Sequence, residues 1–215
     1  MIISHKYKFI FIAVPKTGTT SIEAKLDPLN EVFQLSSEAM DRGSSNIKHI
    51  TLENLKAHTN KNLDSYFSFS FCRNPWDRHL SIYKFYKICI KKWEKNTPPQ
   101  WADHYQRYTN LVGGFESFND FVKSRPGWTE LQTHWLSKNI DFIGRMENIQ
   151  SDFNIICDKI AKQNCPPEEK DQIQLDHLNK SNREDYREVY NNESIDIIAK
   201  AYKKDIDYLG YKFEA

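Results

Sequence analysis

The sequence predicts an α/β fold, a single three-layer domain over residues 1–215 in which a short, mostly parallel sheet is flanked by helices. Three segments predict it, because each passes from an apolar run typical of a buried strand into a helix-forming stretch. They lie at residues 9–26, 66–93 and 140–160. A chain of 215 residues can bury one core of this kind, and no internal repeat indicates a second domain.

The first segment places a loop of small and hydroxyl residues between a strand and a helix. An apolar, β-branched run fills residues 9–14 and stops at Pro15, which cannot donate to a sheet ladder. In this arrangement the loop amides and the first N–H groups of the helix converge, and the helix dipole favours an anion there. Gly18 lets the backbone approach closely. Residues 15–21 are therefore a candidate phosphate site, and the alternative is an ordinary turn rich in helix-capping residues.

The second segment repeats the junction with charged side chains. A strand at 66–71 leads into a helix that Asn74 would cap and Pro75 would begin. Arg73 then lies at the carboxyl end of a strand, where open α/β sheets bind ligands. Ser81 follows about two turns along the helix, so its hydroxyl and the guanidinium could share one phosphate. Arg78 is a weaker candidate, with a solvated charge or a local ion pair as the alternative.

The third segment is a strand at 140–145 followed by an amphipathic helix from Glu147. Four further elements complete the prediction: a short strand or extended piece at 47–51, a helix capped by Thr51, a helix capped by Ser117, and a C-terminal helix over 195–209 that ends at Gly210 and packs on the sheet.

Composition excludes several classes of protein. The net charge is +1, which argues against a nucleic-acid binder. The four cysteines lack CxxC spacing, so we expect reduced thiols and no metal site. The apolar run near the N-terminus is too short for a signal peptide or membrane span. We therefore expect a cytoplasmic protein, with a membrane-anchored or luminal origin left open.

The two junctions carry motifs that resemble those of one family. Lys16 precedes the only glycine of its loop, whereas a Walker A lysine follows two glycines. The order Pro-Lys-Thr-Gly-Thr-Thr-Ser at 15–21 resembles the 5′-phosphosulfate loop of sulfotransferases that use 3′-phosphoadenosine 5′-phosphosulfate (PAPS). Arg-Asn-Pro-Trp-Asp-Arg at 73–78, followed by Ser81, resembles their 3′-phosphate motif. The chain thus resembles the carbohydrate-type sulfotransferase family, which implies a P-loop-like domain related to nucleotide kinases.

The resemblance implies PAPS as donor, adenosine 3′,5′-bisphosphate (PAP) as product, and no metal. Lys16 would stabilise charge on the bridging oxygen as the 5′-phosphate leaves, and Arg73 with Ser81 would hold the 3′-phosphate. The 5′-phosphate itself would be held by Thr17, Gly18, Thr19, Thr20 and Ser21.

A late segment, His-Leu-Asn-Lys-Ser at 177–181, resembles a loop that closes over the cofactor. Lys180 and Ser181 would donate to phosphate, although a capped helix start there is equally compatible. Arg145 follows the strand at 140–145 and would either help hold the nucleotide or pair with Glu147.

The acceptor hydroxyl needs a base, for which neutral imidazole is suited. His49 lies in a His-Ile-Thr-Leu-Glu context that resembles a base-carrying segment of some carbohydrate sulfotransferases. The alternatives are His58, His104, His134 or a purely structural histidine. The acceptor would be a carbohydrate or another hydroxyl compound, and residues 91–114 are either an insertion that binds it or a packed aromatic loop.

Three other functions remain open at this point. A small nucleotide or metabolite kinase would need ATP and Mg²⁺, and the missing Walker A order argues against it. A non-catalytic nucleotide-binding protein could keep the same fold. Sulfation of protein tyrosine would use the same chemistry on a different acceptor. The sequence leaves the acceptor and the oligomeric state undetermined.

Overall fold

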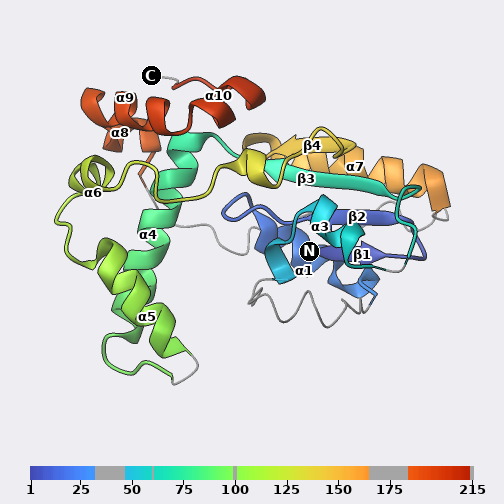
Figure 1. Cartoon of the computed structure of the whole chain (residues 1–215), viewed down its shortest axis with the longest axis horizontal. Helices are drawn as coiled ribbons and strands as arrows, with labels where there is room; N and C mark the ends of the chain where they lie inside the picture. The colour runs from blue at the N-terminus through green and yellow to red at the C-terminus, as the bar shows by residue number, and fades with distance from the viewer. Residues whose placement is uncertain (32–46, 60, 99–100, 165–183, 214–215) are drawn as a thin grey trace. The chain divides into compact units, whose positions relative to one another are not determined.

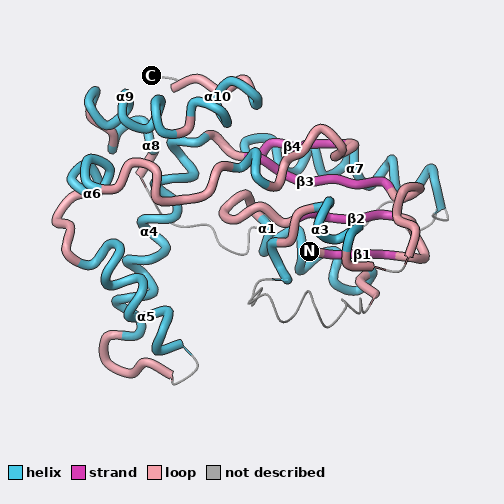
Figure 2. Tube along the Cα trace, viewed as in Figure 1, coloured by secondary structure: helices cyan, strands magenta, loops and turns pink. Residues whose placement is uncertain are grey.

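The described strands of the protein form one four-stranded sheet, which is drawn in magenta in Figure 2. The computed structural model describes residues 1–31, 47–59, 61–98, 101–164 and 184–213. The strand order is β1-β2-β3-β4, with β1 antiparallel to β2 and the other pairs parallel. The predicted α/β fold with a mostly parallel sheet flanked by helices is therefore confirmed.

The chain divides into two compact units, and the sheet belongs to the first, made of Met1–Arg73 and Gln132–Ser181. That a single sulfotransferase domain spans 1–215 stays a prediction. The described elements of the first unit are β1 (Ile2–Ser4), β2 (Phe9–Ile12), α1 (Thr19–Leu26), η1 (Asp27–Leu29), η2 (Ile47–His49), α3 (Leu52–Ala57), β3 (Phe67–Cys72), η5 (Gln132–His134), β4 (Phe142–Arg145), η6 (Met146–Asn148) and α7 (Ile149–Asn164) (Figure 1).

The main core lies between one face of this sheet and two helices. Because side chains alternate along a strand, Phe9 and Phe11 point to the same face as Phe69. They pack with Ile22 of α1 and Phe153 of α7, and all five are completely buried. Burial of such large side chains contributes roughly 1.5–3 kcal/mol each. The core therefore fixes α1, and with it the loop that precedes α1, against the sheet.

The predicted short strand or extended piece at 47–51 is wrong for residues 47–49, which form the 3₁₀ turn η2. Strand β1 was not among the expected elements, and it occupies the free edge of β2. The outer edge of β1 is bonded in turn, because Ile3 O accepts from Glu31 N at 2.9 Å and Ile3 N donates to Asn30 Oδ1 at 3.2 Å. Residues 47–49 therefore had no strand edge on this side of the sheet to join.

Three predicted helix caps are confirmed. Thr51 Oγ1 accepts from Asn54 N at 3.2 Å at the start of α3. Asn74 Oδ1 accepts from Trp76 N at 3.0 Å, and Ser117 Oγ accepts from Asp120 N at 3.1 Å. Each bond satisfies an amide of the first helical turn that has no acceptor within the helix.

The second unit, Asn74–Leu131 and Asn182–Ala215, is helical in its described part. Its elements are α4 (Pro75–Trp93), α5 (Ala102–Tyr108), the π-helical turn η4 (Thr109–Gly113), α6 (Phe118–Ser124), α8 (Tyr186–Val189), α9 (Asn192–Ala201) and α10 (Lys203–Leu209).

The C-terminal prediction needs correction. The expected single helix at 195–209 is two helices, α9 and α10, separated at Tyr202, whose φ of −110° and ψ of 22° leave the α-helical region. Tyr202 is buried, and its hydroxyl lies 3.3 Å from His79 Nδ1 on α4. Helix α9 packs on α4 and α6 within the second unit, and its expected packing on the sheet stays a prediction. Gly210 ends α10 with a φ of +67°, as predicted.

Candidate functional site

The loop between β2 and α1 has the backbone geometry of an anion cradle. Gly18 lies just before the first helical residue with a φ of +81°, and its carbonyl accepts from Ser21 N at 3.1 Å and Ile22 N at 3.3 Å. The amides of Thr19 and Thr20 precede these bonds and have no acceptor within the helix. Lys16 also has a positive φ, of 69°. The loop therefore turns sharply twice and presents amides at the positive end of the helix dipole.

The side chains of this loop divide into internal and exposed groups. Thr17 is completely buried, and its hydroxyl donates to Val14 O at 3.0 Å. This bond ties the loop to the end of β2, so the Thr17 hydroxyl proton is used within the protein. Thr19 is buried, Ser21 is half-buried and Thr20 is exposed. Their predicted contacts with a 5′-phosphate stay predictions.

Gly18→Ala is expected to lower the free energy of unfolding by about 1–2 kcal/mol, because L side chains rarely adopt a φ of +81°. The new Cβ would also lie 2.6 Å from both Ile149 Cδ1 and Met146 Sδ, which must move. Gly114→Ala is the matched control, since a Cβ there meets nothing within 4 Å and its φ is −82°. Chemical denaturation measures both variants, and equal stabilities would contradict the assigned backbone role of Gly18.

Arg73 brings the two predicted motifs together. Its side chain is buried, and its Nη1 donates to the main-chain carbonyl of Lys16 at 3.0 Å. The main chain of Arg73 is held by Gln132, which is completely buried. Arg73 N donates to Gln132 Oε1 at 2.9 Å, and Gln132 Nε2 donates to Arg73 O at 2.8 Å. Sequence reasoning missed Gln132, because one glutamine in a short helical stretch carries no local signal of this double contact.

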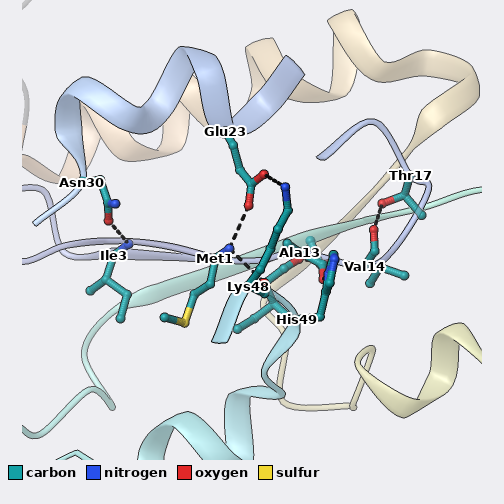
Figure 3. A network of polar contacts seen from close by, with 11 residues as sticks. Met1, Ile3, Ala13, Val14, Thr17, Glu23, Asn30, Lys48 and His49 are labelled. Carbon is teal, nitrogen blue, oxygen red and sulfur yellow. Dashed lines mark hydrogen bonds and ion pairs between the residues drawn. The ribbon is translucent and has the colours of Figure 1, made fainter. Parts of the chain in front are cut away.

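His49 lies beside the same loop (Figure 3). Its Nδ1 is 2.6 Å from Ala13 O, and its own carbonyl accepts from Trp135 Nε1 at 2.7 Å. A carbonyl only accepts, so Nδ1 carries the ring proton and Nε2 has the free lone pair in the neutral form. Among the described residues, Nε2 has no hydrogen-bond partner. Burial lowers the pKa of His49 below its ordinary 6.5, which favours the neutral ring at pH 7.

The turn that carries His49 is fastened to α1 by the neighbouring residue. Figure 3 shows Lys48 reaching Glu23 on α1, with Lys48 Nζ 2.5 Å from Glu23 Oε2. The amino group of Met1 lies 2.9 Å from the other oxygen, Oε1. Burial would raise the pKa of Glu23, but Lys48 and the amino group lower it below its ordinary value. Glu23 therefore stays ionised at pH 7 and helps to fix η2.

The other predicted histidines are placed less favourably. His134 is exposed and His58 is half-buried, and His58 Nδ1 lies 2.7 Å from Asn54 O within its own helix turn. His104 is exposed on α5 of the second unit. His49 is thus the histidine held beside the loop at 15–21, although its role as base stays a prediction.

The remaining candidates lie in different places. Ser81 is half-buried on α4 of the second unit. Arg78 is buried, and its Nη1 donates to Glu130 O at 3.0 Å, which supports a structural role. The amide of Arg145 donates to Asp152 Oδ2 at 2.6 Å. Lys180 and Ser181 lie outside the described residues.

Within the described ranges, the chain has neither a membrane-crossing helix nor a cluster of metal ligands. No helix there has the length and apolar character needed to cross a bilayer. Nor do three or more His, Cys, Asp or Glu side chains come together there as ligands for a metal ion.

The fold is that of an α/β protein with a strand–loop–helix turn at the carboxyl end of a parallel strand, an architecture in which phosphate-bearing ligands bind. The sequence model of a protein family, described as the sulfotransferase family, matches residues 1–212 of the chain. The chain therefore belongs to the sulfotransferase family, which confirms the resemblance drawn from its two motifs.

A more distant comparison gives one named relative. The chain is 22% identical over 240 residues to a Xenopus laevis protein named carbohydrate sulfotransferase 10. The alignment covers 98% of this chain and 66% of that protein, so the chain spans just under two thirds of its relative's length. No solved structure was found to match the chain.

Proposed function

We propose that this protein transfers a sulfuryl group from PAPS to an acceptor hydroxyl, and that the acceptor is a carbohydrate. Membership of the sulfotransferase family supports the reaction class. The name of the Xenopus laevis relative, a carbohydrate sulfotransferase, supports the carbohydrate acceptor. A cytoplasmic location remains part of the proposal.

The observation that carries the donor assignment is the bond from Arg73 Nη1 to Lys16 O at 3.0 Å. PAPS carries a phosphate at each of two ribose positions, so its site needs two anion-binding groups close together. The loop amides and Lys16 supply one group, and the guanidinium of Arg73 supplies the other. Because the two motifs are joined directly, one adenosine bisphosphate could contact both.

The donor supplies a sulfuryl group bound to a phosphate leaving group. A bond forms between the acceptor oxygen and sulfur while the sulfur–oxygen bond to the 5′-phosphate breaks, and the acceptor proton goes to Nε2 of His49. Lys16 stabilises the charge that develops on the departing oxygen. Ser81 shares the 3′-phosphate with Arg73, and Lys180 and Ser181 donate to the phosphates. By analogy with phosphoryl transfer, these residues act mainly through position and charge.

Calorimetric titration with PAP tests the donor assignment, with ADP and Mg²⁺ as the competing ligand of a kinase. We expect PAP to bind and Arg73→Ala to weaken it more than about tenfold, because a hydrogen bond to a charged group contributes roughly 1.5–3 kcal/mol. Arg73→Lys should give an intermediate affinity, since it keeps the charge and loses the planar fork. Arg125→Ala, at an exposed arginine of the second unit, is the control.

Thermal unfolding shows whether each arginine variant is folded before it is titrated. Tighter binding of ADP with Mg²⁺ than of PAP would favour the kinase. Equal PAP affinity of the wild type and a folded Arg73→Ala variant would remove Arg73 from the site.

A further inference from the structure

The second unit contains a hollow whose lining residues have no part in the proposed nucleotide site. Its volume is about 490 Å³, and residues of α5 and η4 form most of its lining. Its lining is formed by Asp103, Gln106, Arg107, Asn110, Leu111 and Trp128. Ligand pockets in proteins have volumes of roughly 300–1,000 Å³, so the hollow has room for one or two sugar rings.

The lining combines hydrogen-bonding groups of both kinds with apolar surface. Asp103 accepts, Arg107 donates, and the two amides do both. One carboxylate and one guanidinium leave the lining without net charge, which disfavours a strongly anionic or cationic ligand. Trp128 and Leu111 supply apolar surface. A hydroxyl-rich, uncharged ring with apolar C–H faces matches this lining better than a phosphate or a peptide side chain does.

Contacts beneath the hollow hold its polar and aromatic groups in place. The ring of Trp128 packs against Tyr86 at a centroid distance of 5.3 Å and against Phe121 at 5.7 Å. Gln106 Nε2 donates to Asn110 Oδ1 at 2.9 Å. This bond orients both amides and leaves Gln106 Oε1 as an acceptor and Asn110 Nδ2 as a donor toward a ligand. Pre-ordered side chains lose less entropy when a ligand binds.

We propose that this hollow binds a neutral sugar unit of the acceptor glycan. The proposal deepens the proposed function and rests on it, because it identifies the ligand as part of the acceptor. It also assigns residues 91–114 a part in acceptor binding, one of the two roles left open for them. Aromatic residues there stack on one another, with Trp93 on Trp101 and Tyr108, while Asp103, Gln106 and Arg107 line the hollow.

The test is an oligosaccharide array probed with the full chain, printed with neutral hexose and hexosamine glycans and with glycans that bear uronate or sulfate. We expect retention of neutral glycans. The double variant Asp103→Ala/Gln106→Ala should weaken it about tenfold, the loss expected for two hydrogen bonds. Gln150→Ala is the matched control, because Gln150 Nε2 donates to Asn154 Oδ1 at 2.8 Å, the same type of pair on α7 of the first unit.

Retention of neutral glycans that the double variant loses and the control keeps would support the proposal. It is overturned if no neutral glycan is retained, if the double variant binds as the wild type does, or if only sulfated glycans bind. Calorimetry with PAP, on the same preparations, separates the two hypotheses. A wild type that binds PAP but retains no neutral glycan would refute the sugar site alone, whereas a wild type that does not bind PAP would refute the proposed donor.

Discussion

Lys16→Ala is expected to lower the turnover number by about 10²–10³ while PAP affinity changes by less than about tenfold. The reason is that the ammonium group meets the largest charge only while the sulfur–oxygen bond to the 5′-phosphate breaks. The substitution spares the contact to Arg73, which involves the main-chain carbonyl of Lys16. The loop should also keep its conformation, because a φ of 69° is similarly unfavourable for lysine and for alanine.

Single-turnover transfer from radiolabelled PAPS to a pool of oligosaccharides measures this effect, and calorimetry measures PAP affinity. Lys16→Arg keeps the positive charge and should recover part of the rate. Lys25→Ala, on the last turn of α1, is the control for removing a lysine from the same segment. A Lys16→Ala variant with the wild-type rate would exclude Lys16 from the chemical step.

His49→Ala is expected to lower transfer by about 10²–10⁴, the usual contribution of a general base, without a change in PAP affinity. The effect follows from the tautomer, since the contact of Nδ1 with Ala13 O leaves the lone pair on Nε2. His58→Ala is a matched control, because Nδ1 of His58 also lies close to a main-chain carbonyl, that of Asn54 at 2.7 Å. Loss of activity in the control alone would assign the base to His58.

The pH dependence of transfer gives a second readout of His49. Because burial lowers its pKa below 6.5, the ring is neutral at pH 7 and becomes protonated only at lower pH. The rate should therefore be level near pH 7 and fall as the pH drops through that lowered pKa. The acidic fall should be absent in the residual activity of His49→Ala. A wild-type profile that falls already above pH 6.5 would contradict the assignment.

The strand-to-helix junctions could be predicted because their signals are local. Pro15 ends the strand of the first junction, and Asn74 with Pro75 begins the helix of the second, so neighbouring residues set each boundary. Gln132 could not be predicted in the same way. It meets Arg73 across 59 residues of sequence, and only the folded chain brings its amide to both main-chain groups.

The incorrect strand at 47–51 has a different cause. β-branched residues such as Ile47, Ile50 and Thr51 indicate that a segment can be extended, but a strand also needs a free edge beside it. Here Ile2–Ser4 pairs with β2, and residues 30–31 bond the outer side of that added strand. Whether residues 47–51 form a strand or a turn therefore depends on which segments of the chain occupy this edge of the sheet. The same turn brings His49 to Ala13, so the missed edge and the placement of the candidate base are connected.

The double contact of Gln132 makes the nucleotide site dependent on distant parts of the chain. A fragment that stops before residue 132 would leave the amide and carbonyl of Arg73 without these two bonds, although it would contain both phosphate motifs intact. Such a fragment should bind PAP poorly because Arg73 is no longer held in position, although every phosphate-binding residue of the two motifs is present. A nucleotide titration of this protein would thus report on correct folding as much as on recognition.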